Sequence, residues 1–129
     1  RFCGPSSDAF IEEEYKRIIA LYEMLKLSGY TPRIYPHSYV GGTILIRENG
    51  ETKFIVMQGN HRVAILSHLG YENINVRLIP SSLKYVYEKS VYEWIMVKKN
   101  LCNEKDAIKI FNLFFEENGN HIKKYIHSL

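Results

Sequence analysis

Apolar residues recur at intervals of three and four along the first quarter of the chain, which is the spacing of one face of an α-helix. The recurring positions are Ile11, Tyr15, Ile18, Tyr22 and Leu25. Ser7 stands before this pattern as a preferred N-cap, and Ser28-Gly29 follows it as a stop signal. We therefore expect a helix that begins after Ser7, ends near Ser28 and buries this face.

Two short apolar runs come next, Thr43–Arg47 and Thr52–Met57, and both read as strands. Between them stands Glu48-Asn49-Gly50-Glu51, and an Asn-Gly pair flanked by apolar runs indicates a hairpin with a type I′ turn. The preceding segment, from Tyr30 to Gly42, fits no regular element and is predicted to be a long loop.

The second strand runs directly into Gly59, where a helical pattern starts. Gly59 permits a tight turn, and Asn60 is a good N-cap. Val63, Leu66 and Leu69 then recur at helical spacing until Gly70 ends the helix. The pattern predicts a strand that leads through a glycine turn onto a helix.

A third strand and two helices are predicted in the rest of the chain. Ile74–Ile79 alternates, with Ile74, Val76 and Leu78 on one face, and stops at Pro80. Ser81–Asn100 is predicted to be helical from the spacing of Tyr87, Val91, Trp94 and Ile95. A second helix should run from an Asn103 cap to Asn118-Gly119. Its aromatic stripe should cover the sheet or, where exposed, form a partner surface; its positions are Ala107, Ile108, Phe111, Phe114 and Phe115.

Size, charge and cysteine content narrow the class of protein. The 129 residues fit a single domain with a real core. A net charge of +3 does not favour nucleic acid, and Lys98-Lys99 and Lys123-Lys124 are expected to be solvated. Cys3 and Cys102 make no disulfide framework, which fits a reducing, cytoplasmic setting. No apolar run approaches the length of a membrane span. A chain that starts at Arg1 can also belong to a longer protein with additional domains.

The chemistry of the glycine turn points to an anion. Free amides and the positive end of the dipole gather at a helix N-terminus, and His61 and Arg62 would add side-chain donors in the first turn. A phosphate or carboxylate would suit such a site. The same residues could instead be solvated or paired with nearby acids, so the residues alone leave both interpretations open.

Few other residues suggest chemistry. Glu14 lies on the flank of the buried face of the first helix and is the acid best placed to reach a cleft. Arg33 and His37 could add anion contacts or be plain surface residues, and His121 and His127 lack convincing metal partners. Walker A and Rossmann glycine patterns, a zinc set of Cys and His and a nucleophile elbow are absent from the sequence.

Gln58-Gly59-Asn60-His61-Arg62, followed by Ala64, by Leu69-Gly70-Tyr71 and by the strand Ile74–Arg77, resembles the ParB/sulfiredoxin superfamily. The likeness runs from about Ile18 to Pro80. It implies an α+β fold with a small mixed sheet, a β-hairpin and flanking helices. On this basis residues 1–80 would form the core of a single domain 1–129, and residues 81–129 a helical extension.

The branches of that superfamily differ at the junction. Gly59 matches the turn glycine, and His61 and Arg62 match the pair that contacts phosphates. Asn60 stands where sulfiredoxins have their reactive cysteine, which argues against reductase activity. The DNA-partitioning branch has Glu-Arg-Arg at positions 60–62, and this chain lacks a helix-turn-helix region. The kinase-like branch has Asp-Gly-His-His-Arg, so His61 and Arg62 agree and the acid is replaced by Gln58.

The resemblance therefore implies a nucleotide-binding domain, and we expect an ATP-dependent phosphotransferase that acts with Mg²⁺ on a small hydroxylated metabolite or a saccharide. Residues 58–62 would bind the nucleotide phosphates, and Glu14 and His61 would be catalytic, Glu14 as a base or metal contact. Ser6, Ser7, Arg33 and Thr43 would line the site; no cluster of protein ligands for a metal is expected. A non-catalytic module that senses a nucleotide or phosphorylated ligand, and a DNA-associated protein or nuclease, are the alternatives.

Overall fold

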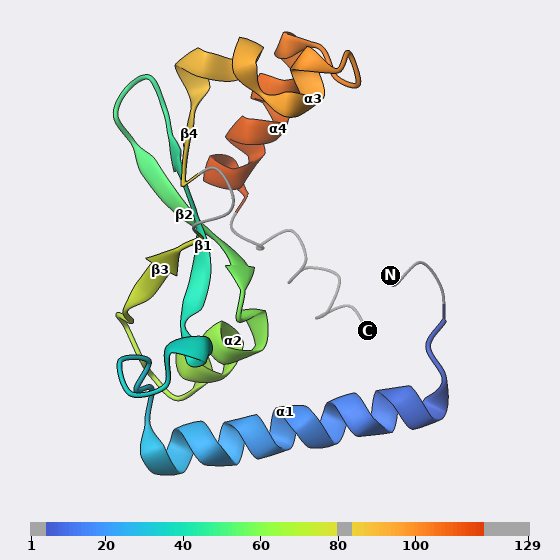
Figure 1. Ribbon diagram of the computed structural model, residues 1–129, viewed down its shortest axis with the longest axis vertical. Coiled ribbons are helices and arrows are strands. Elements are labelled where there is room, and N and C mark those ends of the chain that lie inside the picture. Colours follow the sequence, from blue (N-terminus) through green and yellow to red (C-terminus); the bar gives the residue numbers. More distant parts are fainter. Residues whose placement is uncertain (1–4, 80–83, 118–129) are drawn as a thin grey trace. The chain divides into compact units, whose positions relative to one another are not determined.

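The computed structural model describes residues 5–79 and 84–117, which combine helices with a small sheet (Figure 1). The elements in chain order are α1 (Asp8–Ser28), a 3₁₀ turn (Pro36–Ser38), β1 (Val40–Ile46), β2 (Thr52–Gln58), α2 (Asn60–His68), β3 (Val76–Leu78), β4 (Tyr85–Tyr87), a 3₁₀ segment (Glu88–Glu93), α3 (Ile95–Lys98) and α4 (Glu104–Glu116). The predicted α+β class is confirmed. Predictions for Cys3, Pro80, Ser81, Asn118-Gly119, His121, Lys123-Lys124 and His127 lie outside the described residues.

The chain divides into two compact units, and each unit combines segments that are distant in the sequence. The first contains Arg1–Gly41 and Val56–Arg77, and the second contains Gly42–Ile55 and Leu78–Leu129. Strands β1, β2 and β3 each contribute residues to both units. The prediction of a single domain stays a prediction. Within the described residues, no helix is long and apolar enough to cross a membrane.

Strand β1 is the centre of the sheet that the described residues form. The order is β2-β1-β3, and β4 also pairs with β1, in parallel, with Leu45 opposite Val86. The strand begins at Val40, before the predicted start at Thr43, so the loop prediction was wrong for its last three residues. A glycine is needed within the strand because a Cβ at Gly42 would lie 2.7 Å from the Phe54 ring and also overlap the Ile55 carbonyl.

The hairpin between β1 and β2 is confirmed, but its predicted type I′ turn is wrong. A type I′ turn needs positive φ at two central residues, and in this turn only Gly50 has it, with a φ of 88°. The Asn49 side chain accepts a hydrogen bond from the Glu51 amide at 2.9 Å, which holds Asn49 in an Asx-type conformation. The Arg47 amide then donates to the Glu51 carbonyl at 2.9 Å, closing a three-residue loop.

The core of the first unit lies between the second half of α1 and helix α2. Leu25, Ile65 and Leu66 are buried there. Partly buried apolar residues surround them: Ile18, Leu21, Tyr22, Tyr30, Leu69 and Ile74. The Ser7 cap of α1 is confirmed, because the Ser7 hydroxyl accepts a hydrogen bond from the Phe10 amide at 3.2 Å. The predicted apolar face of α1 is wrong for Ile11 and Tyr15, which are exposed, because the shorter α2 covers only the later turns.

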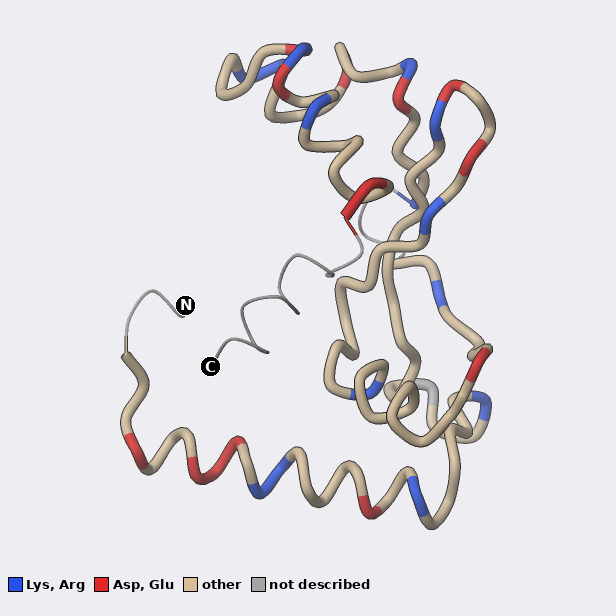
Figure 2. Tube along the Cα trace, turned by 180° about the vertical axis from the view of Figure 1, so that it is seen from behind, with Lys and Arg blue, Asp and Glu red and all other residues tan. Residues whose placement is uncertain are grey.

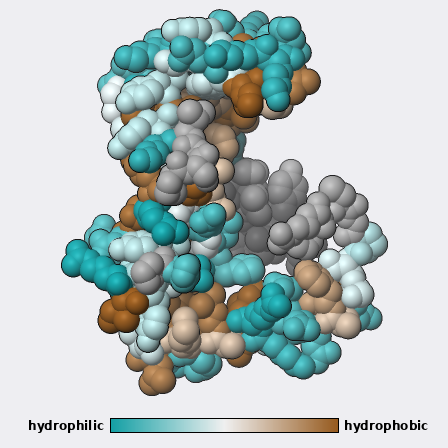
Figure 3. All heavy atoms as spheres, in the orientation of Figure 1, coloured by the Kyte–Doolittle hydropathy of each residue, from teal (hydrophilic) through white to brown (hydrophobic). Residues whose placement is uncertain are grey.

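The second unit is built around α4. Its Asn103 cap is confirmed by a 2.8 Å hydrogen bond from the Asp106 amide to the Asn103 side chain. Phe111 is buried, and its ring centroid lies 5.4 Å from the ring centroid of Trp94 and 5.4 Å from that of Phe115. Apolar side chains also reach the surface over α3 (Figure 3), where Ile95 and Met96 are exposed.

The predicted helix over Ser81–Asn100 is wrong in its described part. Tyr85–Tyr87 forms β4, a 3₁₀ segment follows, and only Ile95–Lys98 is α-helical. The reason is long-range pairing: the Ile44 amide of β1 donates to the Lys84 carbonyl at 3.0 Å, so the edge of β1 recruits this segment as a strand. The third predicted strand is confirmed only over Val76–Leu78. Val76 is exposed and Ile79 buried, against the predicted alternation, because the strand ends before Ile79.

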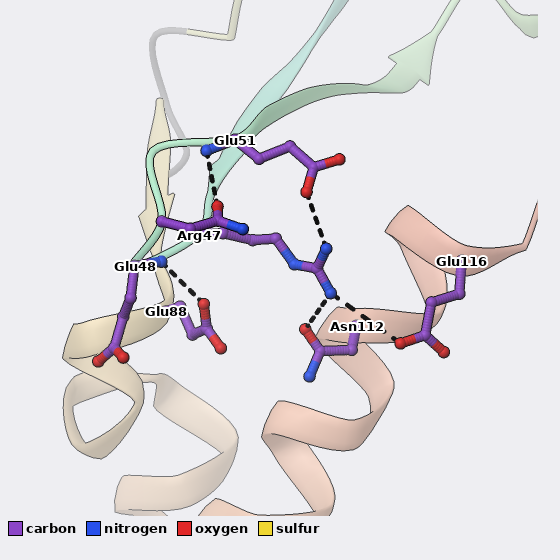
Figure 4. Close-up of polar contacts among 7 residues, drawn as sticks. Arg47, Glu48, Glu51, Glu88, Asn112 and Glu116 are labelled. Atoms are coloured by element: carbon purple, nitrogen blue, oxygen red, sulfur yellow. Dashed lines mark hydrogen bonds and ion pairs between the residues drawn. The ribbon is translucent and has the colours of Figure 1, made fainter.

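Arg47 joins the hairpin to α4 within the second unit (Figure 4). Its guanidinium donates to the Glu51 carboxylate at 2.8 Å and to the Asn112 side-chain oxygen at 3.0 Å. The same group lies 4.5 Å above the Phe115 ring centroid, and the side chain is 22% exposed. One planar cation therefore holds a turn, an amide and an aromatic ring together.

We expect Arg47→Ala to lower the free energy of unfolding by about 1–3 kcal/mol, because hydrogen bonds to a charged group and a partly buried cation–π contact are lost together. Arg47→Lys should recover only part of this, since an ammonium cannot satisfy both acceptors in the same plane. Urea denaturation measures the effect, with Lys109→Ala on the exposed side of α4 as the control. Equal stability of the Arg47→Ala and Lys109→Ala variants would contradict the prediction.

Candidate functional site

The turn between β2 and α2 is built on Gly59. This residue has a φ of 88° and a ψ of 28°, in the left-handed region that favours glycine. A Cβ there would also come 3.3 Å from the Cα of Val40, so a larger residue would be both strained and crowded. Gly59 therefore brings the end of β2 close to β1 and sets the direction in which α2 begins.

The N-cap of α2 lies one residue before the predicted Asn60, so that prediction was wrong. Gly59 is the N-cap and Asn60 is the first helical residue, and among the described residues the helix has no side-chain cap because glycine has no side chain to supply one. Asn60 cannot act as the cap because it already has helical backbone geometry. The amide groups of the first turn have no acceptors within the helix, and without a side-chain cap they are available to an external acceptor.

A pocket of about 700 Å³ opens at this N-terminus. Its lining comes from two helices of the first unit: Phe10, Glu14, Ile18 and Leu21 of α1, and Gly59 with Asn60, His61 and Arg62 at the start of α2. The structure thus brings Glu14 together with the glycine turn, the arrangement that the sequence predicted for a cleft. The pocket combines an apolar wall, one carboxylate and a cationic helix end.

Arg62 contributes a guanidinium to the pocket lining. Its side chain is half-buried, and the Nε atom is buried without a hydrogen-bond partner among the described residues. A Cβ on Gly59 would lie 3.6 Å from the Arg62 Nη1 atom, so the guanidinium is next to the turn. Buried polar groups are normally hydrogen-bonded, and an unpaired guanidinium N–H beside free amides is suited to an anionic acceptor.

Comparison with known proteins identifies no relative of this chain. No protein-family model, curated protein or solved structure matches the chain. The resemblance of residues 58–62 to the ParB/sulfiredoxin superfamily stays a prediction. What the pocket can bind is therefore inferred from its own residues.

Of the described residues that line the pocket, Glu14 is the one with a carboxylate. Its side chain is 31% exposed and accepts a hydrogen bond from the Arg17 guanidinium at 3.2 Å. The described residues contain no group of three or more His, Cys, Asp or Glu side chains that could hold a metal ion. A divalent cation in this pocket would need further oxygen ligands in addition to Glu14. The phosphate oxygens of a nucleotide could supply them for Mg²⁺.

Other predicted site residues lie elsewhere. The hydroxyl of Ser7 caps α1, and Ser6, Arg33 and Gln58 are exposed residues that do not line the pocket. Thr43, in the second unit, is buried and its hydroxyl donates to the Lys84 carbonyl at 3.1 Å. His61 lines the pocket but its side chain is largely exposed.

The apolar wall of the pocket was missed. Phe10, Ile18 and Leu21 line it together with Glu14. Together with Glu14 these residues follow one another at intervals of four, four and three. That spacing places all four in one row on α1, and it can be read from the sequence. The sequence alone does not distinguish this row from the neighbouring positions Ile11 and Tyr15, which have the same spacing. Only the position of α2 decides which row faces the pocket.

Proposed function

We propose that the first unit is a nucleotide-binding module whose pocket holds the phosphate groups at the N-terminus of α2. The observation that supports this most strongly is the buried Nε of Arg62, which has no partner in the described part of the chain and lies beside a first turn without a side-chain cap there. A phosphate oxygen would accept hydrogen bonds from both kinds of donor and would be stabilised by the helix dipole. His61, an exposed residue that also lines the pocket, would contact an outer phosphate.

The size and lining of the pocket support a ligand larger than inorganic phosphate. Its volume of about 700 Å³ falls within the range of small-molecule and cofactor sites. Phe10, Ile18 and Leu21 offer an apolar surface for a ring or a sugar face. A ParB/sulfiredoxin-like arrangement of hairpin, glycine turn and helix belongs to the same proposal.

Calorimetric titration tests the binding proposal. ATP, ADP, CTP and GTP are titrated into the protein with and without Mg²⁺, and inorganic phosphate is the reference. Because binding depends mainly on the phosphate chain, we expect the triphosphates to bind most tightly and inorganic phosphate most weakly. A protein that binds none of these anions would contradict the proposal and leave the α2 N-terminus as a purely structural feature.

A second candidate function is ATP-dependent phosphoryl transfer to a small hydroxylated metabolite or a saccharide, and the position of Glu14 favours it. A carboxylate that lines the phosphate pocket could accept the proton of an acceptor hydroxyl, while the α2 amides and Arg62 stabilise charge on the transferred phosphoryl group. With Glu14 acting as the base, Mg²⁺ would be held by the nucleotide's own phosphate oxygens and would neutralise part of their charge.

Glu14→Gln should then abolish ATP-dependent product formation, which ³¹P NMR detects, while ATP affinity changes by less than about threefold. Glu13→Gln is the matched control, because Glu13 lies on an exposed side of α1 away from the pocket. Turnover by the Glu14→Gln variant would exclude Glu14 as the base. Wild-type protein that binds ATP but turns over no hydroxylated acceptor would favour a non-catalytic nucleotide sensor instead, consistent with Gln58 in place of an acid.

A further inference from the structure

Helix α1 is much longer than the helix it packs against. Its 21 residues extend over about 31 Å, whereas the nine residues of α2 extend over about 13 Å. Only the later turns of α1 share the core with α2, through Ile18, Leu21, Tyr22 and Leu25. The first half of α1 continues past α2 (Figure 1).

That first half carries an apolar stripe on its surface. Ile11, Tyr15 and Ile19 follow one another at intervals of four and are 55%, 64% and 43% exposed. The stripe is distinct from the row of α1 that lines the pocket, which contains Phe10, Glu14 and Ile18. Each residue of the stripe comes one position after one of these three and therefore lies about 100° around the helix from it. Short helical segments are marginal in water without a packing partner. The local pair of Glu12 and Lys16, at 3.3 Å, contributes only a few tenths of a kcal/mol.

The charges along α1 indicate what kind of helix fits this stripe. Residues 8–14 contain four carboxylates and no basic side chain, and residues 15–22 contain Lys16 and Arg17 and no acid (Figure 2). A second α1 laid antiparallel would place each acidic segment beside a basic one. A parallel copy would place like charges together, which is unfavourable.

We propose that the chain forms a two-fold symmetric dimer through antiparallel α1 helices that cross at Tyr15. In this register Ile11 of one copy faces Ile19 of the other, and the two Tyr15 rings meet on the axis. Glu12 and Lys16 both flank the stripe on the side away from the pocket. Glu12 of one copy and Lys16 of the other are then about 3 Å apart along the helix axis, within reach of each other's side chains.

The proposed interface leaves the pocket open, so the dimer does not depend on the nucleotide proposal. Three apolar residues per copy make a small contact, and a small contact implies a reversible, concentration-dependent dimer. Sedimentation velocity over a range from low micromolar to near-millimolar protein should therefore show a monomer–dimer equilibrium. A protein that stays monomeric throughout this range would overturn the proposal.

Tyr15→Lys is the decisive variant, because it places two like charges on the symmetry axis. We expect the dissociation constant to rise by about tenfold or more. Leu27→Lys is the matched control: it also replaces an apolar residue of α1 by lysine, but at a site that is 89% exposed and outside the stripe. Circular dichroism checks that both variants keep their helix content. A dimer that tolerates Tyr15→Lys as well as it tolerates Leu27→Lys would overturn the proposed interface.

Disulfide trapping tests the direction of the pair without relying on any change of charge. In a background with Cys3→Ser and Cys102→Ser, an equimolar mixture of Ile11→Cys and Ile19→Cys proteins should cross-link to each other under mild oxidation. Either variant alone should not, because in the antiparallel register the two identical positions lie far from the axis. Cross-linking of the Ile11→Cys protein with itself, and not with the Ile19→Cys protein, would indicate a parallel pair and overturn the antiparallel model.

Discussion

Replacing Arg62 by alanine is expected to weaken ATP binding by about tenfold to a hundredfold, because a charge-assisted hydrogen bond to phosphate contributes about 1.5–3 kcal/mol. The free energy of unfolding should change little. The Nε of Arg62 has no partner among the described residues, so its removal eliminates a buried unsatisfied donor and breaks no hydrogen bond of its own. A loss of affinity without a loss of stability is what separates a binding residue from a structural one.

Calorimetry with ATP and urea denaturation measure the two quantities on the same protein. Arg77→Ala is the matched control, because Arg77 belongs to the same unit, is exposed, and lies 5.6 Å above the Tyr39 ring, away from the pocket residues. Arg62→Lys should retain part of the affinity, since a lysine supplies the charge but not the planar fork. Equal ATP affinity in the Arg62→Ala, Arg77→Ala and wild-type proteins would place the phosphate site elsewhere.

The sequence predicted most reliably those features that depend on near neighbours. The Ser7 and Asn103 caps each need only a hydroxyl or amide side chain and an amide three residues later. The hairpin at Asn49-Gly50 and the turn at Gly59 likewise depend on glycine's freedom to adopt positive φ. Such local chemistry sets where elements begin and end, whatever the rest of the fold does.

Features that depend on distant partners could not be predicted in this way. Tyr85–Tyr87 forms a strand because it pairs with Ile44–Ile46 of β1, although the spacing of Tyr87, Val91, Trp94 and Ile95 favoured a helix. The exposed position of Ile11 and Tyr15 follows from the length of α2, which the pattern of α1 does not contain. In both cases a long-range partner overrides a local preference.

The candidate site shows the same division. The cationic end of the pocket was predicted because Gly59, His61 and Arg62 are consecutive or nearly so. The opposite wall was predicted only at Glu14, because a carboxylate on the flank of an apolar face is conspicuous and Phe10 or Leu21 is not. Which apolar row of α1 faces α2 is decided by how two helices pack, and that depends on side chains from both.

Leu66→Ala is expected to have the largest effect on stability, lowering the free energy of unfolding by about 2–5 kcal/mol. Leu66 is 1% exposed and lies in the core with Leu25 and Ile65, where α1 and α2 meet. Truncation would remove apolar contacts and leave a cavity that two fixed helices cannot close. Urea denaturation measures the shift, with the slope of the transition unchanged if the two-state behaviour is kept.

Leu27→Ala is the matched control, because it makes the same chemical change on α1 at a position that is 89% exposed, and it should shift the free energy of unfolding by less than about 0.5 kcal/mol.

Leu66→Ala should also affect the pocket. Leu66 holds α2 against α1, so the protein that remains folded after Leu66→Ala should bind ATP more weakly although the variant removes no group that lines the pocket. Unchanged ATP affinity in that variant would mean that the first turn of α2 keeps its position without the core beneath it, and that Gly59 and the end of β2 alone determine where the phosphate site lies.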